Sequence, residues 1–158
     1  MITAVDTNIL LDLLIPDERY RETSKALLDH HHEAGRLVIC DIVYAELSSQ
    51  FPTKDETDDF LHRTRIQILR VPEEALHLAG RMWRVYSDRR STRRSCPACG
   101  EPVESSCSRC HAPILIRQHI ISDFIIGAHA LLQADILLTR DKGFYRKHYE
   151  NLKLASHT

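Results

Sequence analysis

At 158 residues, with 43% hydrophobic and 27% charged residues, the chain is long enough for one buried core and too short for two ordinary domains. A formal net charge of -1 excludes a global attraction to nucleic acid or membrane, so a polyanion would have to bind at a local patch. The first residues carry no basic leader, and no apolar run is long enough to cross a bilayer. We therefore expect a soluble, cytoplasmic protein with no membrane partner.

Short β-branched or apolar runs alternate with longer helical patterns along the chain. The order is strand 2–5, helices 8–14 and 21–35, strand 36–40, helix 41–51, strand 66–71, helix 72–90, helix 120–133, strand 134–140 and a last possible strand at 152–156. This rhythm is typical of an α/β fold whose mainly parallel sheet is covered on both faces.

The composition changes between the helical patterns at "SDRRSTRRS" and stays rich in Pro, Ser and Cys up to about Pro113. The apolar helical pattern then returns. We interpret residues 91–115 as a small module inserted into a single domain that spans 1–158.

Four of the five cysteines lie in this module as two C-x-x-C pairs separated by seven residues: Cys96, Cys99, Cys107 and Cys110. Two such turns can direct four thiolates at one ion, which is the closed tetrahedral set of structural zinc sites. The segment has almost no large apolar side chains, so bound Zn²⁺ would supply its ordering energy. Two disulfides or an iron site remain alternatives. The fifth cysteine, Cys40, ends an apolar run and is expected to be a buried small hydrophobe.

Four acids fall where open parallel sheets bind ligands. Asp6 ends the first expected strand, and Asp141 follows the strand at 134–140. Glu46 lies in the first turns of the helix after the second strand, and Asp123 opens an apolar helix. The carboxyl ends of the strands and the helix N-termini that follow them meet along one edge of such a sheet. Each acid alone also fits a cap, a turn or a solvated surface, so only their joint placement favours function.

Two of these acids lie where a carboxylate is costly. Glu46 shares a helix face with Ile42 and Val43, and Asp123 precedes the nearly all-apolar stretch 124–132. Clustered carboxylates there require a cation, and oxygen ligands suit Mg²⁺ or Mn²⁺. Such a site can activate water against a phosphodiester. Three polar neighbours are candidates for orienting the carboxylates or metal waters, and each also fits a cap or turn: Asn8, Ser122 and Thr139.

The stretches "AVDTNILLDLL", "YAEL", "SDFIIGAHA" and "LLTRDKGFY" resemble the four acidic motifs of PIN-domain ribonucleases, and closely those of VapC-type toxins from toxin-antitoxin pairs. The resemblance covers residues 1–90 and about 115–155. It implies a three-layer α/β/α fold and Mg²⁺- or Mn²⁺-dependent cleavage of single-stranded RNA. It also implies a small antitoxin partner and a homodimer.

The resemblance implies roles for individual residues. Asp6, Glu46 and Asp123 would form the metal-binding core, and Asp141 would complete it. Thr139 matches the family's threonine two residues before the last acid. The zinc-ribbon-like insertion stands where most VapC-type toxins have only a short link. This departure does not change the set of acids. It does put in doubt which substrate and which partner the resemblance implies.

Basic residues gather in the span that leads into the insertion: Arg81, Arg84, Arg89, Arg90, Arg93 and Arg94. Guanidinium groups suit phosphate, so all but the first are candidate RNA contacts, although a solvated helix end explains them equally well. Trp83 and Tyr86 are expected in the core. The histidines at 30–32 are expected at an exposed helix end.

Three functions compete. The leading hypothesis is a metal-dependent endoribonuclease toxin. A second is a PIN nuclease of the kind that processes ribosomal RNA with a zinc ribbon, although there the ribbon usually follows the whole PIN core. A third is a zinc-dependent adaptor that binds RNA or protein without chemistry, in which the acids are inert.

Overall fold

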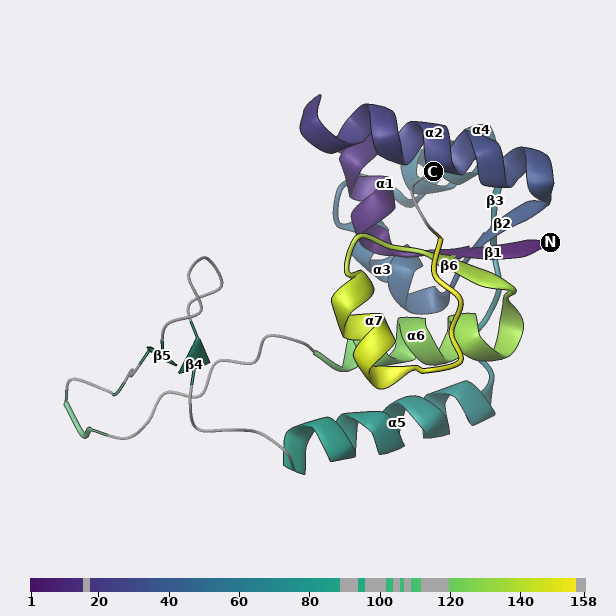
Figure 1. Ribbon diagram of the computed structural model, residues 1–158. Helices are drawn as coiled ribbons and strands as arrows, with labels where there is room; N and C mark the ends of the chain where they lie inside the picture. The colour runs from purple at the N-terminus through teal and green to yellow at the C-terminus, as the bar shows by residue number, and fades with distance from the viewer. Residues whose placement is uncertain are drawn as a thin grey trace.

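Four short strands form a central sheet (Figure 1) in the computed structural model, which describes residues 1–15, 18–88, 94–95, 102–103, 106, 109–111 and 120–155. They are β1 (Ile2–Val5), β2 (Arg36–Ile39), β3 (Ile66–Ile68) and β6 (Ile136–Leu138). Their order is β3-β2-β1-β6, and each neighbouring pair is parallel. The predicted parallel α/β sheet is confirmed.

Helices cover both faces of this sheet. They are α1 (Thr7–Leu14), α2 (Glu18–Ala34), α3 (Asp41–Ser48), α4 (Lys54–Thr64), α5 (Glu73–Asp88), α6 (Ile121–Gln133) and α7 (Lys142–His148). Because parallel strands are joined by right-handed crossovers, the steps from β1 to β2 and from β2 to β3 pass over one face, and the return from β3 to β6 passes over the other. Figure 1 shows α2 on one face and α6 on the other, with α5 packed outside α6. This is the three-layer α/β/α arrangement.

Burial on both faces explains the strand sequences. Leu37, Val38 and Ile39 are consecutive in β2 and all are buried, whereas a strand with one wet face would alternate. The central helix α6 contacts β1, β6, α3 and α5, and it is apolar nearly all round for that reason. Because a crossover helix runs antiparallel to the strands that it connects, α6 starts at the carboxyl edge of the sheet. Its first turn carries Asp123.

A glycine fixes how the C-terminal segment lies on α6. A Cβ atom at Gly127 would come within 2.4 Å of the Tyr149 ring, so only glycine lets the ring lie against the helix backbone. The Tyr149 hydroxyl also donates a hydrogen bond of 2.6 Å to the carbonyl oxygen of Phe124. The chain that leaves α7 is thereby attached to the first half of α6.

Two helices were not among the predicted elements. The first, α4, begins after Thr53, whose hydroxyl accepts from the amide of Glu56 at 3.3 Å, and this T-x-x-E pattern is a capping signal in the sequence. The second, α7, begins after Asp141, which caps it. Strand β3 ends earlier than predicted, and the last predicted strand is reduced to a single bridge between Leu137 and Leu154.

The expectation of an exposed histidine triplet at 30–32 is wrong for its middle member. His31 is only 6% exposed, and its Nδ1 lies 3.2 Å from the hydroxyl of Thr3 in β1. Consecutive helix positions point in different directions, so one of three must face the sheet. Cys40 is buried as predicted, and Trp83 and Tyr86 pack against Phe124 as expected of core residues.

Most of the inserted segment lies outside the described residues. Within it, β4 (Arg94–Ser95) pairs antiparallel with β5 (Pro102–Val103), and the side chain of Cys110 is exposed. Cys96, Cys99 and Cys107 are outside the described ranges, and so are Arg89, Arg90 and Arg93. No helix in the described part of the chain is both long and apolar enough to cross a membrane.

Candidate active site

Asp6 lies at the point where the neighbouring strands β1 and β6 end. It follows β1 directly, and its backbone amide donates to the carbonyl oxygen of Leu138, the last residue of β6, at 2.9 Å. The residue is 6% exposed although it is a carboxylic acid. A buried carboxylate is costly unless donors surround it, so its partners define the site.

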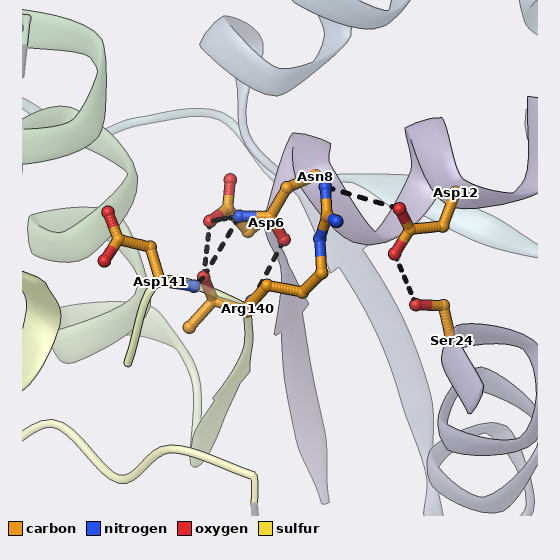
Figure 2. Close-up of polar contacts among 7 residues, drawn as sticks. Asp6, Asn8, Asp12, Ser24, Arg140 and Asp141 are labelled. Carbon is orange, nitrogen blue, oxygen red and sulfur yellow. Dashed lines mark hydrogen bonds and ion pairs between the residues drawn. The ribbon is translucent and has the colours of Figure 1, made fainter. Parts of the chain in front are cut away.

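Three side chains direct donors at one oxygen of Asp6. The Asn8 amide and the Thr139 hydroxyl each lie 2.6 Å from Asp6 Oδ2, and the Tyr145 hydroxyl lies 3.4 Å from it. Thr139 Oγ1 also accepts from the backbone amide of Asp141 at 3.0 Å. Figure 2 shows Asp6 and Asn8 in the middle of this network, with Asp141 on one side. These three donors fix the Oδ2 oxygen of Asp6, and a hydrogen bond from the backbone of Thr7 also supports the carboxylate.

The three other acids are each held by a donor from their own surroundings. The Thr7 hydroxyl, one residue after Asp6, donates to Glu46 on α3. The amide of Ile120 donates to Asp123 at 2.9 Å at the start of α6. The amide of Phe144 donates to Asp141 at 3.2 Å at the start of α7. The helix-capping role that the sequence left open for Asp123 is therefore confirmed, and Asp141, for which a turn was the alternative, caps α7.

Electrostatics connects these acids to Asp6. Burial raises the pKa of Asp6 from 3.8 to about 6, and the charges of Asp123 and Glu46 raise it as well, while the Thr139 hydrogen bond opposes them. Burial also raises the pKa of Tyr145, with further contributions from Asp6, Asp123 and Asp141. Asp6 therefore feels the charges of Glu46 and Asp123, and Tyr145 feels those of Asp6, Asp123 and Asp141.

The described residues contain no group of three or more His, Cys, Asp or Glu side chains placed closely enough to hold a metal ion directly. Asp6, Glu46, Asp123 and Asp141 therefore do not converge on one point in the described structure. The donor set nevertheless suits a hard cation, since Mg²⁺ keeps several waters and is usually held directly by one or two carboxylates. The hydroxyl of Ser122, beside Asp123, is buried and has no hydrogen-bond partner within the described ranges. A buried hydroxyl of this kind is able to hydrogen-bond to a water bound at the site.

Comparison with known proteins decides the family. The family model of the PIN domain matches residues 3–148 of the chain. The chain belongs to the PIN-domain family. No curated protein sequence matches it significantly.

Solved structures agree with this fold. VapBC2 from Rickettsia felis bound to a DNA fragment from its promoter superposes with a TM-score of 0.60 at 19% identity, covering 98% of each chain. VapBC-1 from nontypeable Haemophilus influenzae gives 0.58 at 19%, covering 99% of this chain and 98% of the other. FitAcB from Neisseria gonorrhoeae gives 0.59 at 16%, with coverages of 99% and 97%. At these identities the similarity establishes the PIN fold.

Only some of the other predicted residues of this PIN domain are placed at Asp6 by the structure. The structure places Asn8 and Thr139 on Asp6, whereas the Ser122 hydroxyl has no hydrogen bond to an acid among the described residues. Arg84 is exposed on α5 and lies 3.7 Å from Asp88, a contact within its own helix. Arg94 lies in β4, and its side chain is outside the described part of the structure. The RNA-contact role of the basic span stays a prediction.

Sequence reasoning missed four residues of the PIN-domain site. Thr7 and Tyr145 contact Glu46 and Asp6, and neither carries a signal beyond its position next to an acidic motif. Arg140, which is partly exposed, forms an ion pair with buried Asp12 beside Asn8. A signal for Asp12 alone was present, because this acid interrupts the apolar helix pattern "NILLDLL" and a buried carboxylate needs a partner.

Proposed function

We propose that this PIN domain is a metal-dependent endoribonuclease that cleaves single-stranded RNA, and that it is the toxin of a toxin-antitoxin pair. The observation that carries the proposal is buried Asp6, which shares its surroundings with the negative charges of Asp123 and Glu46. Clustered carboxylates with so little solvent are unfavourable by themselves. A divalent cation would offset that cost.

Mg²⁺ or Mn²⁺ fits the donor chemistry, and Asp6, Glu46, Asp123 and Asp141 are the residues that would hold it, in part through its waters. When bound, the ion would lower the pKa of a water and neutralise charge on the phosphodiester. The protein's own contribution is orientation. Thr139, Asn8 and Tyr145 fix the orientation of the Asp6 carboxylate, and Thr7 fixes that of Glu46.

Cleavage of labelled RNA in the presence of Mn²⁺ tests the proposed activity. We expect Asp6→Asn and Glu46→Gln each to reduce the rate by at least about 100-fold, since each removes a charge from the site while keeping its shape. The matched control is Asp29→Asn, which removes an exposed carboxylate on α2 whose partner is Lys25. Equal cleavage by wild type and both site variants would rule the activity out.

Calorimetric titration with Mn²⁺ separates the nuclease from the adaptor hypothesis without measuring activity. Wild type should bind Mn²⁺, and the Asp6→Asn variant should bind it at least about tenfold more weakly because a direct ligand is lost. Absence of Mn²⁺ binding to the folded wild type would favour the adaptor.

An antitoxin partner is supported by the VapC-type resemblance and by the VapBC assemblies among the similar folds. Co-expression with the product of a neighbouring short gene, followed by size-exclusion chromatography, tests this part of the proposal. We expect a stable complex in which RNA cleavage is suppressed. Analytical ultracentrifugation of the toxin alone tests the proposed homodimer.

We further propose that Cys96, Cys99, Cys107 and Cys110 bind one structural Zn²⁺. The support is the spacing of the two C-x-x-C pairs. Elemental analysis of reduced protein that has not met a chelator should find about one zinc per chain, and Cys96→Ser with Cys110→Ser should abolish it. A zinc-free wild-type protein would contradict this assignment.

A further inference from the structure

Arg140 stands between the two polar clusters of Figure 2. It follows β6 and precedes Asp141, and its backbone amide donates to Asn8 Oδ1 at 3.1 Å. Asn8 in turn donates to Asp6. The backbone of Arg140 is therefore fixed by the same side chain that orients the central acid of the site.

The guanidinium group of Arg140 is held by a buried anchor. Its Nη2 lies 3.3 Å from Asp12 Oδ1, and the other oxygen of Asp12 accepts from the hydroxyl of Ser24 at 2.6 Å. The Asp12 side chain is 5% exposed, whereas that of Arg140 is 37% exposed. The ion pair between Lys25 and Asp29, in contrast, joins two exposed side chains. An arginine held from beneath by a buried acid keeps its conformation while part of it faces solvent.

An aromatic ring supports the same group. The central carbon of the guanidinium lies 4.6 Å from the centroid of the Tyr20 ring on α2. Stacking on a ring and pairing with one carboxylate oxygen together restrict the plane of the guanidinium. A guanidinium has five N–H donors in a rigid fork, and one oxygen of Asp12 accepts only a small part of this capacity.

We infer that Arg140 is an RNA-binding residue that holds the phosphate next to the one that is cleaved. The inference rests on the proposed nuclease function. Figure 2 shows the Arg140 guanidinium on the Asp12 side of Asn8, with Asp141 on the far side of Asp6. The guanidinium therefore lies beside Asp6 and Asp141 and not between them. A strand of RNA that enters a site lined by four acids needs a fixed cation beside it, and a guanidinium fork matches phosphate oxygens.

The alternative is that Arg140 only neutralises Asp12, and the salt dependence of RNA binding separates the two roles. Binding of fluorescein-labelled oligouridine is measured by anisotropy in EDTA over a series of salt concentrations. Each phosphate contact on a single strand contributes about 0.7 to the slope of log K against log salt. We expect Arg140→Ala to lower this slope by about 0.7 and to weaken binding about tenfold, whereas Arg140→Lys keeps the slope because it keeps the charge.

A matched control is present at the other edge of the sheet. Arg70 follows the edge strand β3 as Arg140 follows the edge strand β6, and Arg70 also pairs with an aspartate, Asp41, at 2.8 Å. Arg70→Ala should leave both slope and affinity unchanged. Arg140→Ala leaves the buried charge of Asp12 without its cation, and the variant could fail to fold for that reason. In that case the double variant Asp12→Asn with Arg140→Ala removes both partners and should show the same loss of slope.

The outcomes distinguish this inference from the proposed function. Wild-type protein that cleaves RNA, together with an Arg140→Ala slope equal to that of wild type, would overturn the role of Arg140 and leave the nuclease intact. Wild-type protein that neither binds nor cleaves RNA would overturn both. In cleavage assays with Mn²⁺ we expect Arg140→Ala to raise KM about tenfold and to change kcat little, because it removes binding energy that is equal in ground and transition states.

Discussion

The hydroxyl of Thr139 lies 2.6 Å from the carboxylate of Asp6, across 133 positions of sequence. The two residues follow neighbouring parallel strands, and their contact closes the site at the sheet edge. Thr139 also accepts from the amide of Asp141, so one hydroxyl couples two of the four acids. The geometry of the site therefore depends on the register between β1 and β6.

Removing that hydroxyl should loosen the site. Thr139→Val keeps the shape of a side chain that is 3% exposed but removes the donor to Asp6 and the acceptor for Asp141. We expect a loss of about 1–3 kcal/mol in the free energy of unfolding at neutral pH, measured by urea denaturation. Thr139→Ser retains the hydroxyl and should recover most of the loss. A Val variant as stable as wild type would show that the hydrogen bond contributes nothing net.

The pKa of Asp6 predicts how stability varies with pH in metal-free protein. The pKa of Asp6 in the folded protein, about 6, exceeds its ordinary value of 3.8, so ionisation of Asp6 opposes folding. This destabilisation is complete above pH 6 and disappears well below pH 3.8. Asp6→Asn should therefore stabilise the protein at pH 7.5, by at most about 3 kcal/mol, and by less as the pH falls toward 4. Thermal unfolding in EDTA across this range measures the effect. Asp29→Asn, which changes an exposed acid, should show no such trend.

A buried histidine gives the opposite dependence on pH. His129 is 1% exposed in α6, and burial lowers its pKa although a backbone hydrogen bond with Leu69 and the charge of Asp41 oppose this. Asp41 itself is paired with Arg70. Since the unfolded chain binds the proton more tightly, the contribution of His129 to stability is lost as pH falls below 6.5. His129→Gln should therefore reduce the loss of stability between pH 7 and pH 5, measured by urea denaturation.

The comparison for that experiment is His77→Gln on the exposed side of α5. This exposed change should leave the pH dependence as in wild type. Equal pH slopes for wild type and His129→Gln would contradict a neutral buried imidazole.

Two helix glycines should respond in opposite directions to alanine. Gly127→Ala forces a methyl group into the Tyr149 ring, and we expect it to cost about 1–3 kcal/mol. Gly80 lies in α5 with nothing within 4 Å of an added Cβ, so Gly80→Ala should stabilise the protein by up to about 1 kcal/mol. Denaturation midpoints of the two variants test this, and stabilisation by both would mean that Tyr149 moves aside without cost.

Periodicity predicted the elements that a core requires. The apolar runs that became β1, β2 and β6 and the all-apolar face of α6 were readable because burial demands them. The helices α4 and α7 were missed because their apolar pattern is weak and their signals are caps, at Thr53 and Asp141. Local signals of that kind also fit turns, so pattern alone does not separate them.

The acids were predicted from their places at strand and helix ends, and the structure brings the charges of Glu46 and Asp123 to act on Asp6, but the partners that hold these acids were mostly not predictable. Nothing in the sequence connects Thr7 with Glu46 or Arg140 with Asp12, because each pair is formed between elements far apart in the chain. Such contacts depend on how helices pack over the sheet, and hydrophobic patterning fixes which face is buried without fixing which polar side chains meet.

The amino-acid sequence by itself determined the α/β class and the position of Asp6, Glu46, Asp123 and Asp141 at the ends of elements, since these follow from local periodicity. Only the tertiary structure decided that β6 lies beside β1 in the order β3-β2-β1-β6 and thereby places Thr139 on Asp6 and Arg140 over Asp12. The physical reason is that strand neighbours are selected by packing of the whole core, and a polar contact between two strand ends exists only once that choice has been made.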